Sequence, residues 1–278
     1  MEPVTVTRGG SAVVLGMPHT GTWLSDDCME RLNDNGRLLA DTDWHIDRLY
    51  DGLLAGATVV RANFHRYVID ANRDPSGQSL YPGQNTTGLC PLTDFDGKPL
   101  YRGGMAPDEV ETARRLNDFH APYHAALTAE LERVRAMHGV AALYDCHSIR
   151  SRIPFLFEGV LPDFNIGTNG GATCAPQIEA ATVETCAGAG GYSHVLNGRF
   201  KGGWTTRRYG RPAEGLHAIQ MELAQSTHLQ TEEPPFAYDE AKAGWLRTHL
   251  GAILEHLNAI ALSGALTGAL TNDRGETP

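Results

Sequence analysis

The sequence has few cysteines and no long apolar run. The five cysteines are Cys28, Cys90, Cys146, Cys174 and Cys186. Their odd number and the lack of a Cys-x-x-Cys pair argue against a disulfide framework or a cysteine zinc site, and predict reduced thiols in a cytoplasm. No run reaches the roughly 18 apolar residues of a membrane-spanning helix. Residues 1–6 lack the charged start and apolar core of a signal peptide. We therefore expect a cytoplasmic protein that does not bind membranes.

Positive charge is also scarce. The chain has 23 Lys and Arg against 33 Asp and Glu, a formal net charge of -10 at pH 7, and no basic cluster. Such a chain is not expected to bind nucleic acid non-specifically. The sequence contains no Gly-x-Ser-x-Gly elbow, which argues against a Ser-His-Asp hydrolase. The expected partner is a small-molecule substrate, bound by a monomer or a small homo-oligomer.

The composition is that of a globular protein with a full core. Hydrophobic residues make up 41% and charged residues 20% of the chain, which are ordinary fractions. Its 278 residues suit one large α/β domain or two small ones. Because we find no internal repeat and no domain boundary, we predict a single domain over residues 1–278. Its core would cover about residues 10–262, followed by a polar tail at 263–278.

Apolar runs alternate along the chain with segments of helical period. Strands are predicted at residues 13–17, 57–62, 140–145, 166–168, 192–197 and 216–223. Helices are predicted at residues 107–138, 176–187 and 238–261, with a kink or break at Pro122. Residues 75–106 and 200–212 are predicted loops, the first crossing the site and the second cationic. This order indicates an α/β fold with a mixed, mostly parallel sheet flanked by helices.

Polar residues gather where the predicted strands end. In open α/β sheets the carboxyl ends of parallel strands form the ligand site. The strand-end groups are His19, Asp43 or Asp47, Arg66, Asn72, Arg73, His147 and Glu222. Each of them alone also has a purely structural interpretation. A buried histidine can pair with an acid such as Asp145, an acid can cap a helix, and Asp70 can pair with Arg66 or Arg73.

The combination of residue types is more specific than any single member. Two histidines and one carboxylate make a catalytic Zn²⁺ site with one position left for water, although Mn²⁺, Fe²⁺ and Co²⁺ also bind such sites. Glu222 suits the transfer of a proton from water to a leaving nitrogen. Asn72 and Arg73 would bind a substrate carboxylate or stabilise an oxyanion.

Five segments, in order and with plausible spacing, resemble the N-formylglutamate deformylase (N-formylglutamate amidohydrolase) family. They are residues 18–22, 41–50, 66–75, 145–148 and 219–223. The resemblance extends from about residue 10 to residue 262. It implies hydrolysis of N-formyl-L-glutamate to L-glutamate and formate, the last step of one route of histidine degradation. It also implies a fold similar to the zinc carboxypeptidases (phosphorylase/hydrolase-like) and the aspartoacylase-like amidohydrolases.

The resemblance suggests residue roles as well. Those relatives use a histidine and a glutamate three residues apart, but here the position three after His19 is Thr22. The carboxylate ligand must come from elsewhere, and we expect Asp43, with Asp47 as its substitute. The predicted metal ligands are His19, Asp43 and His147, and the predicted catalytic residue is Glu222.

The two carboxylates of the implied substrate need two cationic contacts. The Asn72-Arg73 pair resembles an Asn-Arg pair that those relatives use on a substrate carboxylate. Candidates for the second arginine are Arg66, Arg150, Arg207, Arg208 and Arg211. The sequence departs from the family pattern at one further place: it has Thr227-His228 where the resemblance leads us to expect an aromatic residue. This difference concerns the shape of the substrate site.

Two alternatives remain open from the sequence. The first is an amidohydrolase of another N-acyl amino acid or a small peptide, which the pocket volume beside the metal would decide. The second is a non-catalytic amino-acid-binding protein of the same fold.

Overall fold

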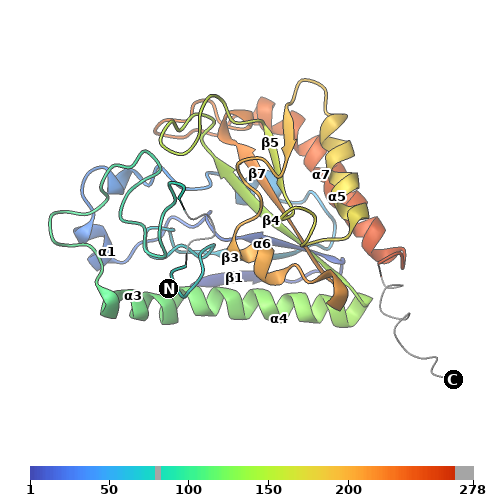
Figure 1. Ribbon diagram of the computed structural model, residues 1–278, viewed down its shortest axis with the longest axis horizontal. Coiled ribbons are helices and arrows are strands. Elements are labelled where there is room, and N and C mark those ends of the chain that lie inside the picture. The colour runs from blue at the N-terminus through green and yellow to red at the C-terminus, as the bar shows by residue number, and fades with distance from the viewer. Residues whose placement is uncertain (79–82, 267–278) are drawn as a thin grey trace.

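A seven-stranded sheet forms the centre of the computed structural model, which describes residues 1–78 and 83–266 (Figure 1). The strands are β1 (Val4–Thr7), β2 (Val13–Met17), β3 (Thr58–Ala62), β4 (Ala141–Ile149), β5 (Phe164–Gly167), β6 (His194–Leu196) and β7 (Leu216–Ala224). Their order across the sheet is β1-β3-β2-β4-β7-β5-β6. The central strands β3, β2, β4 and β7 are parallel, whereas β1 is antiparallel to β3 and β5 is antiparallel to β7. The predicted α/β class with a mixed, mostly parallel sheet is confirmed.

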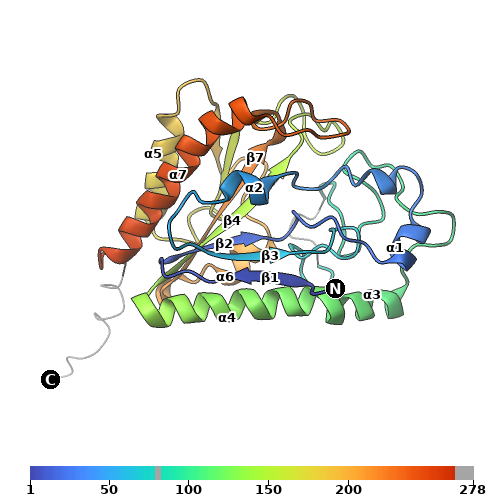
Figure 2. The same ribbon diagram turned by 180° about the vertical axis from the view of Figure 1, so that it is seen from behind.

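Helices cover both faces of this sheet (Figures 1 and 2). They are α1 (Asp26–Arg31), α2 (Ile46–Tyr50), α3 (Glu109–Arg115), α4 (Ala121–His138), α5 (Pro176–Ala187), α6 (Trp204–Tyr209) and α7 (Glu240–Leu262). α5 and α7 pack side by side on one face, and the long α4 runs along the other (Figure 1). The sheet therefore has a hydrophobic core on each side.

The apolar stripes of the long helices explain why they pack there. Leu246, Leu250 and Ile253 of α7 are completely buried against one face, and Leu127 and Val134 of α4 against the other. Each fully buried side chain of this kind stabilises the fold by about 1.5–3 kcal/mol. All residues of β4 are buried, as expected for a central parallel strand.

Several predicted elements match the structure closely. β2 and α5 have the predicted bounds, and the predicted helix at residues 107–138 consists of α3, a π-helical segment (Leu116–His120) and α4. The irregular segment ends just before Pro122, which has no N–H to donate and lies in the first turn of α4. The described part of the predicted loop at residues 75–106 contains no helix or strand beyond isolated bridges.

Other predictions need correction. The segment at residues 200–212, predicted as a loop, contains the short helix α6, because Thr205, Thr206 and Tyr209 bury one side of a helical turn. β4 extends to Ile149, so His147 lies within the strand and not after it. The short edge strand β1 was not predicted.

Some expectations concern the ends and the thiols. α7 ends at Leu262, and the predicted polar tail lies outside the described residues from position 267 onwards. All five cysteines are free thiols. Within residues 1–78 and 83–266 no helix has the length and apolarity to cross a membrane.

Candidate active site

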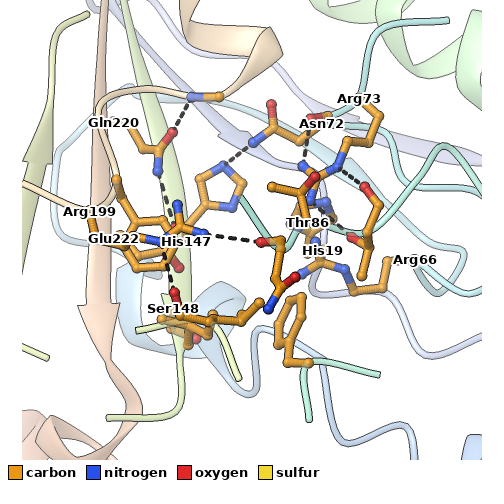
Figure 3. A pocket seen from close by; sticks show the side chains of 17 residues that line it. His19, Arg66, Asn72, Arg73, Thr86, His147, Ser148, Arg199, Gln220 and Glu222 are labelled. Carbon is orange, nitrogen blue, oxygen red and sulfur yellow. Dashed lines mark hydrogen bonds between the residues drawn. The ribbon is translucent and has the colours of Figure 1, made fainter. Parts of the chain in front are cut away.

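A pocket opens at the carboxyl edge of the parallel strands β2, β4 and β7 (Figure 3). His19 follows β2 after Pro18, and His147 lies near the end of β4. Glu222 of β7 is the register partner of His147. All three side chains line the pocket. The topology thus brings these three residues together, although His19 and Glu222 lie 203 positions apart in the chain.

Three buried groups converge at the inner end of this pocket. Ligand atoms of His19, Asp43 and His147 all lie within 4.8 Å of one another. Asp43 Oδ2 is 3.1 Å from His147 Nδ1 and 3.7 Å from His19 Nδ1. The backbone N–H of Asp43 donates to the carbonyl of His19 at 3.1 Å, which fixes the loop before α2 against the end of β2. The three side chains form a group that is able to hold a metal ion.

Each histidine has a buried carboxylate behind it. His19 Nε2 is 2.8 Å from Asp70 Oδ1, and His147 Nε2 is 3.1 Å from Asp145 Oδ1. These contacts leave both Nδ1 atoms facing Asp43. A carboxylate that accepts from the outer ring nitrogen fixes the tautomer and orientation of a metal-binding histidine. Asp70 gives His19 this outer support through a hydrogen bond, and Asp145 lies in the corresponding place behind His147.

The His147 ring has a second neighbour at the same nitrogen. Asn72 Nδ2 lies 3.2 Å from His147 Nε2, and Asn72 Oδ1 accepts from the Thr205 backbone N–H at 2.9 Å. One tautomer of His147 cannot satisfy both Asn72 and Asp145. Because Asn72 Oδ1 is held by Thr205, the Asn72 amide N–H₂ faces Nε2 and donates to it, whereas Asp145 Oδ1 has no hydrogen-bond partner among the described residues. A metal held at Nδ1 would instead require the N–H on Nε2, with Asp145 as its acceptor.

The electrostatics of the cluster depend on its neighbours. Burial disfavours the charged form of Asp43, but the imidazoles of His19 and His147 outweigh burial and lower the pKa of Asp43. Burial also disfavours the imidazolium of His147, yet Asp145 and Asp43 raise the pKa of His147 well above its usual value. The positive guanidinium groups of Arg66 and Arg73 overcome burial and hold the pKa of Asp70 well below its usual range.

Two atoms of the cluster lack hydrogen-bond partners. His19 Nδ1 and Asp43 Oδ1 are buried and have no hydrogen-bond partner among residues 1–78 and 83–266, although Arg66 Nη1 lies 3.6 Å from Asp43 Oδ1. An unsatisfied buried polar atom costs about 1–3 kcal/mol. Coordination of a cation would remove that cost, because both atoms carry lone pairs and lie beside His147. The residues present therefore fit a divalent metal.

Glu222 lies beside this cluster with a defined hydrogen bond. Its side chain is largely enclosed, and burial raises its pKa to about 8. Gln220 Nε2 donates to Glu222 Oε2 at 3.1 Å, while Gln220 Oε1 accepts from the Gly203 backbone N–H at 2.7 Å (Figure 3). The Gly203 contact fixes which end of the Gln220 amide faces Glu222. Gly203 is required here, since a Cβ at this position would lie 2.4 Å from Asn72 Nδ2.

The Asn72-Arg73 turn forms another wall of the pocket. Arg73 donates from Nε to the Thr87 carbonyl at 2.9 Å and from Nη2 to Thr87 Oγ1 at 3.0 Å. From α4 and the segment before it, His124 Nε2 lies 2.7 Å from the Ala71 carbonyl and His120 Nε2 lies 3.0 Å from the Arg73 carbonyl. The turn is thus held on both sides, with Arg73 at the pocket.

Not every predicted residue lies at the pocket. Asp47 pairs with Arg61 at 2.6 Å and its side chain is 38% exposed, away from the histidines. Arg150 donates to Asp96 at 3.2 Å and does not line the pocket. Of the two aspartates considered from the sequence, Asp43 is the one that the structure places beside His19 and His147.

The arginines of the α6 segment are also placed elsewhere. Arg208 is exposed beside the Trp204 ring, and Arg207 Nε donates to the Gly202 carbonyl. Arg211 lies at the start of β7, at the opposite edge of the sheet, near Glu132 and Glu214. Neither Arg208 nor Arg211, both predicted as substrate contacts, lines the pocket: Arg208 lies on the exposed side of α6, and Arg211 lies in the segment between α6 and β7.

Sequence reasoning overlooked some pocket residues. Arg199 lines the pocket, as do Gln220 and the loop residues Thr86 and Thr87. Gln220 lies on the same face of β7 as Glu222, two residues before it. The signal for Arg199 was its position just before the paired glycines of residues 202–203. Thr227-His228 does not line the pocket, so this departure from the family pattern leaves its walls unaffected.

The sheet and the site together define an α/β amidohydrolase. The chain belongs to the N-formylglutamate amidohydrolase family, whose sequence profile matches residues 11–229. It is 49% identical over 259 residues to an N-formylglutamate deformylase of Pseudomonas aeruginosa, covering 93% of this chain and 97% of the relative. It is also 49% identical over 253 residues to an N-formylglutamate deformylase of Pseudomonas putida, covering 91% and 94% of the two chains.

Solved structures agree with this assignment. The crystal structure of N-formylglutamate amidohydrolase from Ralstonia eutropha JMP134 superposes with a TM-score of 0.75 at 26% identity, covering 92% of this chain and 98% of that one. A gene product of Agrobacterium tumefaciens has the same fold, with a TM-score of 0.71 at 19% identity over 94% and 96% of the chains. The resemblance inferred from the five sequence segments is confirmed.

Proposed function

We propose that this protein hydrolyses N-formyl-L-glutamate to L-glutamate and formate with the help of a divalent metal. The observation that carries the proposal is the convergence of three buried groups, His19, Asp43 and His147, beside the enclosed carboxyl of Glu222. The 49% identity to deformylases that are named for this substrate supports the choice of N-formylglutamate.

His19 and His147 would hold the metal through Nδ1, and Asp43 through its carboxylate. A bound divalent ion supplies polarisation of the formyl carbonyl and a lowered pKa of water. The set of two histidines and one carboxylate favours Zn²⁺, although other divalent ions accept the same ligands. Asp70 and Asp145 would keep the two rings in the required tautomer.

Glu222 would move the proton of the reaction. It accepts a proton from the attacking water as the C–O bond to the formyl carbon forms. It then delivers this proton to the amide nitrogen as the C–N bond breaks, which releases formate and the amine of glutamate. Gln220, through its hydrogen bond at 3.1 Å, would keep the Glu222 carboxyl aimed at the cluster.

Asn72 and Arg73 would bind the α-carboxylate of the substrate. Asn72 touches the His147 ring, and Arg73 lines the same pocket. Arg66 would act indirectly, since it is buried and ion-paired with Asp70 at 2.7 Å. Bound in this way, the formyl group would point at the cluster.

The cellular setting belongs to the same proposal. Hydrolysis of N-formylglutamate would form the last step of one route of histidine degradation. The free thiols are consistent with a reducing cytoplasm. The protein would act as a monomer or a small homo-oligomer.

Product analysis tests the substrate assignment. Purified protein supplied with a divalent metal should release formate and L-glutamate in equal amounts from N-formyl-L-glutamate, and little acetate from N-acetyl-L-glutamate. Faster release of acetate would identify another N-acyl amino acid as the substrate. Binding of L-glutamate without hydrolysis of either compound would indicate a non-catalytic binding protein.

A further inference from the structure

We infer that Arg199 binds the side-chain carboxylate of the substrate and thereby selects acidic N-formyl amino acids over neutral ones. This inference rests on the proposed function, which requires a ligand with two carboxylates. Arg199 lies in the segment between β6 and α6 and lines the pocket that contains His147 and Glu222.

The arginines at the pocket differ in how they are engaged. Among the described residues, those that line it are Arg66, Arg73 and Arg199. The Arg66 side chain is 6% exposed, donates to Asp70 at 2.7 Å and lies 3.6 Å from Asp43. Since these carboxylates balance its charge, Arg66 is poorly suited to a substrate carboxylate. Arg73 Nη2 also lies 3.7 Å from Asp70, but the Arg73 side chain is 26% exposed and lines the pocket. Arg73 and Arg199 are therefore the two cationic contacts that we assign.

The chemistry of the substrate assigns one carboxylate to each arginine. The α-carboxylate is attached to the carbon that bears the amide nitrogen, so it must lie close to the reacting group. Asn72, which lies 3.2 Å from His147, and the adjacent Arg73 are the nearest candidates. In Figure 3 Arg73 and Arg199 approach the pocket from opposite sides. Arg199 is therefore placed to meet the more distant side-chain carboxylate.

The surroundings of Arg199 orient its guanidinium. Nε donates to the Leu156 carbonyl at 3.1 Å and Nη2 donates to the Asn85 carbonyl at 3.2 Å (Figure 3). Its Cζ lies 5.4 Å from the centre of the Phe200 ring. These contacts orient the guanidinium at the wall of the pocket. Leu156 and Phe200 also line the pocket and offer apolar surface to the two methylene groups of a glutamate side chain.

Glutamate and glutamine have the same shape but differ in charge, so their N-formyl derivatives isolate the contribution of this contact. An arginine–carboxylate hydrogen bond is expected to favour the charged substrate by about 10- to 100-fold in kcat/KM. R199Q should reduce the ratio of kcat/KM for N-formyl-L-glutamate over N-formyl-L-glutamine to about one. R199K should retain part of the preference, because lysine keeps the charge but not the bidentate geometry.

Two further variants serve as controls. R73Q should lower kcat/KM for both substrates alike and leave their ratio unchanged, because Arg73 is assigned to the carboxylate that both share. Arg152 is exposed and does not line the pocket, so R152Q should behave as the unchanged protein. The assignment would be overturned if R199Q kept the original ratio of kcat/KM for the two substrates. It would also be overturned if R73Q, and not R199Q, abolished the preference for N-formyl-L-glutamate.

Product binding provides a test that does not depend on turnover or on R199Q being folded. Calorimetry of the unchanged, metal-loaded protein should show tighter binding of L-glutamate than of L-glutamine, and R199K should narrow the difference. Equal affinities of the unchanged protein would refute the inference even if formate is released. Conversely, a clear preference that depends on Arg199, without formate release, would support the inference while refuting the proposed deformylase activity.

Discussion

Glu222 lies directly opposite His147 in the parallel pairing of β7 with β4. Adjacent strands in register place their side chains next to one another on the same face. This pairing brings the proposed proton carrier beside a proposed metal ligand, although 75 residues separate them in the chain. The relationship is fixed by the backbone of two central strands, all of whose residues are buried.

Removal of the Glu222 carboxylate tests its proposed role. E222Q should lower kcat by about 10²- to 10⁴-fold, the usual contribution of a general acid–base group. KM and metal content should change little, because the amide keeps the shape of the side chain. The matched control is E255Q, on the exposed side of α7, which should leave kcat unchanged. An active E222Q enzyme would assign the proton transfer to another group.

The pH dependence of stability provides a separate test of the environment of Glu222. In the metal-free protein, burial raises the pKa of Glu222 to about 8 from an ordinary value of 4.5. Between these pH values the folded state retains a proton that the unfolded state has lost. The free energy of unfolding should therefore fall as the pH rises through this window, by up to about 1.4 kcal/mol per pH unit from this group.

Urea denaturation in the presence of a chelator measures this effect. The amide in E222Q does not titrate, so the stability of this variant lacks the contribution of Glu222 to the pH dependence. As the pH rises from about 5 to 8, E222Q should therefore become more stable relative to the unchanged protein. A difference that stays constant over this range would show that the carboxyl is not held in its neutral form.

The carboxylate behind His19 should matter for metal affinity. Asp70 lies 2.8 Å from His19 Nε2, and loss of such an outer contact typically weakens metal binding by about 10- to 100-fold. D70N should show this loss in a titration against a competing chelator. D47N is the matched control, because Asp47 pairs with Arg61 at the surface. Weaker binding in D47N but not in D70N would contradict the proposed ligand arrangement.

Much of the fold could be predicted because its strands are apolar runs with abrupt polar ends. This pattern located β2 and β4 and, with them, His19 and His147. Parallel strands share a carboxyl edge, so the two histidines were expected to lie together. The helix α5 was equally clear, since Pro176 starts it and its apolar residues follow a helical period.

The choice among similar polar residues could not be predicted from local sequence. Asp43 and Asp47 are one helical turn apart in sequence, and only the folded loop before α2 shows that Asp43 turns towards His147. Arg208 and Arg211 were candidates from the sequence and Arg199 was not, yet Arg199 lines the pocket and the other two do not. Contacts between distant segments decide such cases, and they have no periodic signature in the sequence.

The most direct test of the central claim is formate release from N-formyl-L-glutamate before chelation, after chelation, and after a divalent metal is returned. Activity should disappear as the metal is removed and return with Zn²⁺ or another divalent ion, in proportion to the metal bound. D43N should bind little metal and stay inactive throughout, while D47N should follow the unchanged protein. Full activity in a sample that metal analysis shows to be metal-free would contradict the account.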